Sequence, residues 1–179
     1  ARDIFHTLLN GGTLFHYDVE KLGYSKLGSW IKENQITIYC SVATLFRYLS
    51  QYLKSPDDLS SVRIIKLGGE ASRRSDIEIF KKLFSDKCIF YTGLASTETG
   101  TIKKDSLIVG EIVPLGYPAE DFQVLVWDSK GVPLKNGEVG EIVVQSEYLS
   151  LGYLGNDEET SKKFLQKGTL RYYKTGDLG

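Results

Sequence analysis

Histidine and cysteine are scarce in this sequence of 179 residues, which contains two of each. His6 and His16 lie near the start, whereas Cys40 and Cys88 stand far apart. A structural zinc site takes about four such ligands at close spacing, and a disulfide framework takes several patterned cysteines. The composition therefore argues against both, and it favours a reducing, cytoplasmic compartment.

Long apolar runs and a charge of one sign are also missing. No stretch reaches the roughly 20 apolar residues of a transmembrane helix, and the first residues show no signal-peptide pattern. The formal net charge is −1, and no basic tract is interleaved with aromatic residues. We therefore expect neither a membrane partner nor a nucleic-acid partner. The 41% hydrophobic and 25% charged residues suit an ordinary globular protein.

The first hundred residues alternate between helical and strand patterns. Helices are predicted at 3–10, 27–34, 44–53 and 75–84, and strands at 13–17, 36–42, 62–67 and 88–91. The helix at 44–53 has Leu45, Tyr48, Leu49 and Tyr52 on one apolar face. This alternation predicts an α/β fold with a mostly parallel sheet flanked by helices.

The pattern changes after about residue 100. Residues 123–127 and 141–144 are predicted strands of an antiparallel sheet, and 113–118 resemble a turn-rich linker. We place a boundary near residue 108. Residues 1–107 would then form an α/β subdomain, and residues 108–179 a smaller β-rich subdomain.

Residues 93–100 (GLASTETG) follow a predicted strand and combine small residues, hydroxyls and a carboxylate. Small residues let backbone N–H groups approach a phosphate closely. Thr97 can donate a hydrogen bond to a phosphate oxygen, and Glu98 can hold a Mg²⁺ ion that bridges phosphates. Taken alone, the segment suits a polar turn in which Ser96 or Thr97 caps a following helix.

Residues 173–179 (YKTGDLG) form a predicted strand that runs into a tight turn. An aspartate presented there, Asp177, can accept hydrogen bonds from the hydroxyls of a ribose. Alternatively, this is a plain turn in which Asp177 satisfies its own backbone.

Five segments occur together in a specific order, namely GGE at 68–70, STE at 96–98, GEVGEIVV at 137–144, LGYLG at 151–155 and YKTGDLG at 173–179. In this order the chain resembles the superfamily of adenylate-forming enzymes over essentially its whole length. That superfamily includes acyl-CoA synthetases, luciferases and the adenylation domains of nonribosomal peptide synthetases. The resemblance implies an internal fragment of the large N-terminal domain, with both predicted subdomains partial.

The resemblance also implies roles for particular residues. Thr97 is similar to a catalytic threonine that contacts the nucleotide phosphate, Glu98 to a catalytic glutamate that holds Mg²⁺, and Asp177 to the ribose-binding aspartate. The residues implied along the adenine are Gly69, Glu70, Ala71, Gly93, Leu94 and Ala95. Those implied around the acyl substrate are Cys40, Lys66, Gly68, Gly93, Thr101 and Ile102.

Three of these residues have alternative interpretations. Leu94 stands where many members carry an aromatic residue that stacks on adenine, which puts nucleotide affinity or selectivity in question. Lys66 would be costly to bury without a paired anion, and it could instead reach the surface from a strand end. Cys40 suits a small core residue as well as a pocket wall.

The implied function is ATP-dependent activation of an amino, hydroxy or fatty acid as acyl-AMP. The acyl group would pass to the phosphopantetheine thiol of a carrier protein in an assembly line, beside neighbouring synthetase domains. A stand-alone acyl- or aryl-CoA ligase that uses CoA, and a degenerate non-catalytic scaffold, stay open as alternatives. The family's phosphate loop and C-terminal lysine are not in this sequence, so we expect the fragment to be inactive alone.

Overall fold

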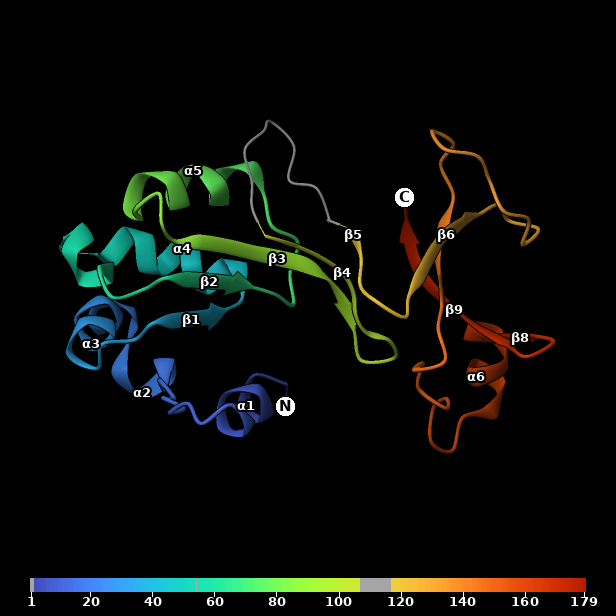
Figure 1. The fold of residues 1–179 in the computed structure, drawn as a ribbon, viewed down its shortest axis with the longest axis horizontal. Coiled ribbons are helices and arrows are strands. Elements are labelled where there is room, and N and C mark those ends of the chain that lie inside the picture. Colours follow the sequence, from blue (N-terminus) through green and yellow to red (C-terminus); the bar gives the residue numbers. More distant parts are fainter. Residues whose placement is uncertain (1, 54, 107–116) are drawn as a thin grey trace. The chain divides into compact units, whose positions relative to one another are not determined.

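The computed structural model describes residues 2–53, 55–106 and 117–179 (Figure 1). Contacts within the chain divide it into two compact units. Among the described residues, the first comprises 2–53, 55–92 and Ser106, and the second comprises 93–105 and 117–179. The boundary predicted near residue 108 falls within 107–116, outside the described residues, and stays a prediction.

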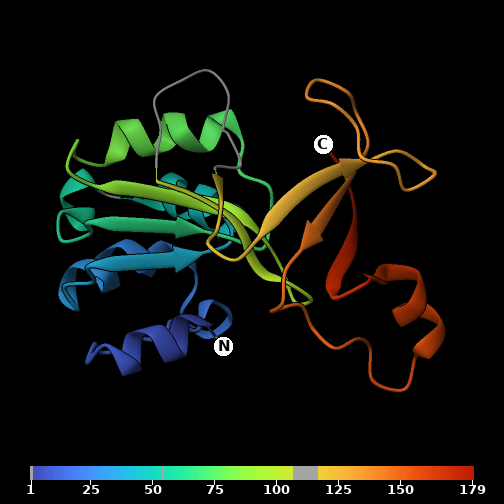
Figure 2. The same ribbon diagram turned by 45° about the vertical axis from the view of Figure 1, so that its right-hand side comes forward.

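The first unit is built around three parallel strands, which lie side by side in both views (Figures 1 and 2). They are β1 (Ile38–Ser41), β2 (Ile64–Leu67) and β3 (Ile89–Ser96), in that order across the sheet, and β3 continues into the second unit. Parallel neighbours need long crossover connections, which helices supply here. The predicted parallel sheet is therefore confirmed.

Four α-helices of this unit lie where apolar periodicity predicts them. The α-helices are α1 (Arg2–Leu9), α2 (Val19–Leu22), α3 (Leu27–Glu33), α4 (Ala43–Tyr52) and α5 (Arg74–Leu83), and the 3₁₀ helices are η1 (Tyr24–Lys26) and η2 (Pro56–Leu59). Each helix predicted from the sequence occurs within one residue of its expected bounds.

The strand predicted at 13–17 is wrong, since these residues form no regular element. The rings of Phe15 and Tyr17 instead pack edge-on against Trp30 of α3, with centroids 6.1 and 5.0 Å away. An alternating pattern makes a strand only where a neighbouring strand accepts its backbone hydrogen bonds. Here the aromatic side chains pack against helix α3 instead.

The apolar face predicted for α4 is partly wrong. Leu45 and Leu49 of the predicted face do pack in the core of the first unit, together with Ala43 and Phe46. Tyr48 and Tyr52 remain 40% and 49% exposed, and their rings pack on Tyr24, outside that core. Tyrosine tolerates such half-exposed positions because its ring is apolar and its hydroxyl is polar.

The second unit contains a four-stranded antiparallel sheet and one helix. The strands are β6 (Gln123–Trp127), β7 (Glu141–Gln145), β9 (Leu170–Leu178) and β8 (Phe164–Lys167), in that order across the sheet, and the helix is α6 (Asp157–Lys163). All described pairs of this sheet are antiparallel. The predicted β-rich second part is therefore confirmed as a fold class.

The end of β3 also belongs to the second unit, where it neighbours β4 (Gly100–Ser106). The short strand β5 (Tyr117–Pro118) pairs with β4 in antiparallel register, with Lys103 opposite Pro118. The end of β3 thus delivers the Thr97–Thr99 segment to the tip of a hairpin.

Strand β7 buries side chains on both faces of its sheet. Val143 packs with Trp127 and Tyr172 on one face, whereas Val144 packs with Tyr173 on the other. Successive side chains of a strand point to opposite faces, so this apolar run serves two clusters. Across residues 2–53, 55–106 and 117–179, no helix has the length and apolar character needed to span a membrane.

Candidate functional site

The segment that ends β3 forms a hairpin turn. Residues 93–96 are the last residues of β3, Thr97–Thr99 make the turn, and Gly100 begins β4 with a positive φ of 74°. A glycine adopts this left-handed conformation without steric cost. The alternative of a helix cap at Ser96 or Thr97 is wrong, because a strand follows the turn.

The hydroxyl groups of the turn divide into two kinds. Ser96 Oγ and Thr99 Oγ1 lie 2.9 Å apart, and Thr99 Oγ1 donates to the carbonyl of Gly100 at 3.0 Å. Thr99 is only 4% exposed, and its hydroxyl makes its hydrogen bonds within the turn. The Thr97 side chain is exposed at the tip. Of these hydroxyls, Thr97 is therefore the one best placed for a ligand.

Glu98 is half-buried and held at both its side chain and its backbone. Its Oε1 accepts a hydrogen bond from the Tyr153 hydroxyl at 2.8 Å, and its carbonyl accepts one from the Ser150 N–H at 2.8 Å. Partial burial would raise the pKa of Glu98, but hydrogen bonds, foremost from Tyr153, outweigh it and lower the pKa below 4.5. The carboxylate is thereby kept ionised at neutral pH.

Residues 149–153, which include part of the LGYLG motif, supply both of these donors. The Arg171 guanidinium supports the segment by donating to the carbonyls of Leu149 and Ser150 at 3.0 and 2.6 Å. Sequence reasoning assigned no role to Tyr153, although the motif that contains it was recognised. Its contact with Glu98 joins residues 55 positions apart, which local patterns do not reveal.

Asp177 lies within strand β9, so the predicted tight turn is wrong. Gly176 interrupts the regular strand with a φ of 84°, and its N–H donates to Glu141 Oε1 at 3.1 Å. The N–H of Asp177 donates to the Thr175 hydroxyl at 3.0 Å. The Asp177 backbone donor is thus satisfied by Thr175, and the Asp177 side chain is exposed.

Strand β9 connects the surroundings of Glu98 to Asp177 within the second unit. Tyr173 is 5% exposed, and burial raises the pKa of its hydroxyl, as do the nearby Tyr153 and Glu98. Asp177 follows Tyr173 by four positions, roughly 13 Å along an extended strand. Glu98 and Asp177 therefore belong to one packed unit, joined through β9.

Leu94 and Ile102 are core residues of the second unit. Ile102 is 1% exposed and packs with Val144, Leu149 and Tyr173, and Leu94 is half-buried against this cluster. Gly93 and Ala95 flank Leu94 on β3. The Thr101 side chain lies outside the described residues. The binding roles predicted for these residues stay predictions.

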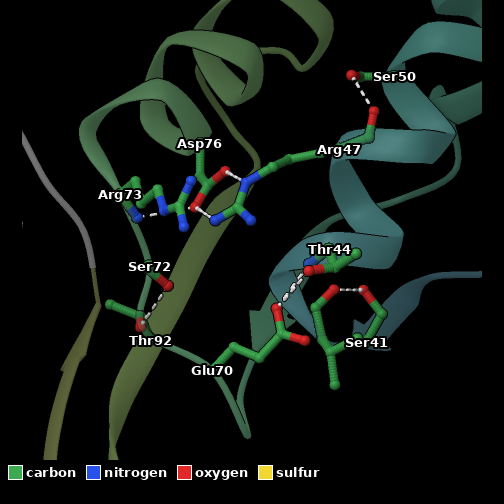
Figure 3. A network of polar contacts seen from close by, with 10 residues as sticks. Ser41, Thr44, Arg47, Ser50, Glu70, Ser72, Arg73, Asp76 and Thr92 are labelled. Carbon is green, nitrogen blue, oxygen red and sulfur yellow. Dashed lines mark hydrogen bonds and ion pairs between the residues drawn. The ribbon is translucent and has the colours of Figure 1, made fainter.

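In the first unit, the segment 69–71 follows β2 and is anchored through Glu70. Figure 3 shows the Glu70 carboxylate turned toward the start of α4, where Oε2 accepts hydrogen bonds from Thr44 N–H and Oγ1 at 2.9 and 2.7 Å. These bonds lower the pKa of Glu70. The Val42 N-cap lacks a capping side chain, so Glu70 supplies the acceptor that the first turn of a helix requires.

A second anchor lies a few residues further along (Figure 3). Arg47 of α4 makes a two-pronged ion pair with Asp76 of α5, at 2.7 and 2.8 Å, and the Arg73 N–H donates to Asp76 at 2.8 Å. Ser72 Oγ and Thr92 Oγ1 lie 3.0 Å apart. The segment that the resemblance assigns to adenine is thus fixed to α4, α5 and β3.

Cys40 and Lys66 lie directly opposite each other on β1 and β2, and Gly68 follows β2. Lys66 is half-buried, and its ammonium pairs with the Asp3 carboxylate of α1 at 2.5 Å. Lys66 is thus neither buried alone nor a free surface group. Cys40 is exposed, so its alternative placement in the core is wrong.

Asp3 is the residue of this group that sequence reasoning missed. Desolvation raises the pKa of the Cys40 thiol, the Asp3 carboxylate raises it further, and the Lys66 ammonium opposes both. An acid, a base and a thiol therefore meet on one face of the first unit. Among the described residues, no three His, Cys, Asp or Glu side chains gather as a metal site.

Comparison with known proteins finds one family over most of the chain. The profile of the family described as AMP-binding enzyme matches residues 1–154. Bacitracin synthase 1 of Bacillus licheniformis is 33% identical over 98% of this chain, which covers 4% of that protein. D-alanine--D-alanyl carrier protein ligase of Bacillus cytotoxicus is 29% identical over 99% of this chain, which covers 36% of that protein.

Among solved structures, the crystal structure of CmiS6 has the same fold. Its TM-score is 0.87 at 23% identity, over 98% of this chain and 45% of CmiS6. The chain thus spans less than half the length of CmiS6 and of the two relatives.

Proposed function

Because the chain belongs to the family of AMP-binding enzymes, we propose that it forms part of a domain that activates a carboxylic acid with ATP. An oxygen of the substrate carboxylate forms a bond to the α-phosphorus, and the bond from that phosphorus to the bridging oxygen breaks. Pyrophosphate leaves with the electron pair of that bond, and acyl-AMP remains. The acid is an amino, hydroxy or fatty acid.

The β3–β4 turn carries this proposal. It exposes the Thr97 hydroxyl, which suits donation to a phosphate oxygen, beside the ionised carboxylate of Glu98. A carboxylate has acceptor sites beyond the one that the Tyr153 bond occupies. Mg²⁺ binds through one or two carboxylates together with substrate phosphates and water, which fits a single glutamate at this turn.

Magnesium held by Glu98 would offset the negative charge of the phosphates as it redistributes. Thr97 then orients a phosphate oxygen, and Asp177 accepts hydrogen bonds from the ribose. Glu98 neither donates nor accepts a proton in this scheme. Its contribution is a fixed charge at a fixed place, which is how preorganised sites lower a barrier.

The remaining predicted contacts extend the same proposal. Gly69, Glu70, Ala71, Gly93, Leu94 and Ala95 line the adenine, and Cys40, Lys66, Gly68, Gly93, Thr101 and Ile102 line the acyl group. In the first unit, the Thr44 and Asp76 bonds support the rigidity that the 69–71 segment needs. The Asp3–Lys66 pair supports a polar wall for the acyl pocket.

We propose a carrier-protein thiol, borne on phosphopantetheine, as the acceptor of the acyl group. The family membership and the printed name of the D-alanyl carrier protein ligase support this acceptor. Neighbouring synthetase domains are further proposed partners, in keeping with the relative named bacitracin synthase 1. The isolated chain is expected to be inactive, because the phosphate loop and the lysine named above are not in its sequence.

Pyrophosphate exchange tests the proposal on the full-length protein that contains this chain. A panel of amino, hydroxy and fatty acids is offered with ATP, Mg²⁺ and labelled pyrophosphate. Exchange with one class of acid, abolished or strongly reduced by Thr97→Ala and Glu98→Gln, is the expected result. Exchange that both variants leave at the wild-type rate would overturn the assignment of these residues.

The acceptor needs a second measurement. Transfer of labelled acid to a phosphopantetheinylated carrier protein, without added CoA, supports the assembly-line proposal. Product release that occurs only with CoA would instead identify an acyl- or aryl-CoA ligase. An absence of any exchange across the panel would favour the non-catalytic scaffold.

A further inference from the structure

We propose that Tyr153 is a positioning residue, which holds the Glu98 carboxylate where it meets a phosphate-bound Mg²⁺ ion. This inference rests on the magnesium role proposed for Glu98. Tyr153 itself touches neither nucleotide nor metal in this proposal, and it acts through the 2.8 Å hydrogen bond from its hydroxyl to Glu98 Oε1.

The tyrosine ring is fixed by packing. It lies edge-on against Phe164, with centroids 5.6 Å apart at 71°, and Phe164 in turn packs on Tyr173 at 4.9 Å. Tyr173 is buried in the core of the second unit. The position of the Tyr153 hydroxyl is thus determined by the core, since a tyrosine ring has only two rotatable side-chain bonds.

The backbone of Tyr153 is anchored as firmly as its ring. Its N–H donates to Thr160 Oγ1 at 2.9 Å, and that hydroxyl donates to the Asn156 carbonyl at 2.8 Å. Thr160 comes so close that a Cβ at Gly152 would lie 2.4 Å from its methyl carbon. Only glycine fits at position 152, where φ is +141°. Gly152 and Thr160 together therefore fix the backbone position of Tyr153.

Glu98 depends on this support because it lies in a hairpin turn. A glutamate side chain in a turn has several accessible rotamers, and ordering it on metal binding costs conformational entropy. The Tyr153 hydroxyl and the Ser150 N–H fix the side chain and the backbone of Glu98 beforehand. Loss of partners that orient metal ligands typically weakens metal affinity 10- to 100-fold.

The test compares two variants that each remove one tyrosine hydroxyl from the same loop region. Tyr153→Phe keeps the ring on Phe164 and deletes the bond to Glu98. Tyr148→Phe is the control, because Tyr148 is 68% exposed and lies outside the contacts described above. Pyrophosphate exchange is measured on the full-length protein against Mg²⁺ concentration, at saturating ATP and acid, with circular dichroism to verify folding.

The expected result for Tyr153→Phe is a half-saturating Mg²⁺ concentration raised about tenfold. The maximal rate at saturating Mg²⁺ and the KM for the acid stay near wild type, and Tyr148→Phe matches wild type throughout. In a Glu98→Gln background, Tyr153→Phe has no further effect on the Mg²⁺ requirement, because the oriented carboxylate is gone.

Different results separate the two proposals. If Glu98→Gln changes the Mg²⁺ requirement but Tyr153→Phe does not, the positioning role is overturned and the proposed function stands. A Tyr153→Phe effect that persists undiminished in the Glu98→Gln background also overturns the positioning role, since the tyrosine then acts on something else. If Glu98→Gln leaves both rate and Mg²⁺ requirement unchanged, the proposed function of Glu98 fails, and the positioning role fails with it.

Discussion

Each unit presents one glutamate after a parallel strand, Glu70 beyond β2 and Glu98 beyond β3, and hydrogen bonds lower the pKa of both. Their donors come from different kinds of element. Glu70 accepts from a backbone N–H and a hydroxyl at the start of α4, which makes it a cap for that helix. Glu98 accepts from the Tyr153 hydroxyl beside an exposed threonine.

The comparison teaches that a lowered pKa does not by itself identify a ligand-binding carboxylate. The resemblance assigned both glutamates to the nucleotide site. The contacts favour a structural role for the Glu70 carboxylate at the start of α4, whereas Glu98 lies in a turn between two strands and caps no helix. Variants that separate stability from activity test this distinction.

The largest effect on stability is expected in the scaffold around Glu70. Asp76 is fully buried and paired with Arg47, so Asp76→Ala leaves an unpaired, partly buried guanidinium. Breaking such a pair costs about 3–5 kcal/mol of the free energy of unfolding, which denaturant titration measures. The exposed Arg74–Glu78 pair supplies the control, and Glu78→Ala should change stability by less than about 1 kcal/mol.

The largest effect on activity is expected at Glu98. Glu98→Gln keeps the size of the side chain but removes its charge, and exchange at limiting Mg²⁺ should fall about 100-fold. Glu70→Gln should show a lowered midpoint of thermal unfolding because the carboxylate bonds to Thr44. It should exchange near the wild-type rate if the backbone at residue 70, and not this carboxylate, makes the proposed contact with adenine. A rate loss in Glu70→Gln as large as that in Glu98→Gln would contradict the structural role assigned to the Glu70 carboxylate.

Acid should weaken both units through these glutamates. A carboxylate whose pKa is lower in the folded state adds to the free energy of unfolding. This contribution is fully present above the pKa of the unfolded state, near 4.5. That contribution is lost as the pH falls through the folded value. The stability difference between wild type and Glu70→Gln should therefore shrink from pH 7 to pH 3, as measured by urea unfolding. A difference that grows on acidification would contradict the lowered pKa.

The smallest effect is expected at Leu94, which packs against the Ile102 cluster of the second unit. If it also borders adenine, Leu94→Tyr should lower the KM for ATP roughly two- to tenfold through aromatic stacking. Leu94→Met keeps a similar volume without an aromatic face and serves as the control. An unchanged KM in both variants would place Leu94 in the core alone.

Much of the fold was predictable because local patterns and local structure agree. The helices at 27–33 and 74–83 and the parallel strands followed from periodicity and alternation. The strand expected at 13–17 failed because its aromatic residues pack on Trp30. The buried face of α4 shifted because tyrosines can remain half-exposed on Tyr24.

Sequence motifs pointed to those residues of the candidate site that are neighbours along the chain, and to no others. Thr97 and Glu98 share one turn, and Asp177 lies in a motif of its own. The partners that orient or neutralise the site come from elsewhere. Asp3 reaches Lys66 across 63 positions, and Tyr153 reaches Glu98 across 55.

Short segments in a fixed order were enough to identify the family, and apolar periodicity was enough to predict α1, α3, α4 and α5. The nucleotide contacts of Thr97, Glu98 and Asp177 stay a proposal. The bonds from Glu70 to the start of α4 and from Tyr153 to Glu98, and the packing of Leu94 on a core, arise only in the folded chain. A hydrogen bond between distant segments depends on where the packed core places them, and neither segment carries that information alone.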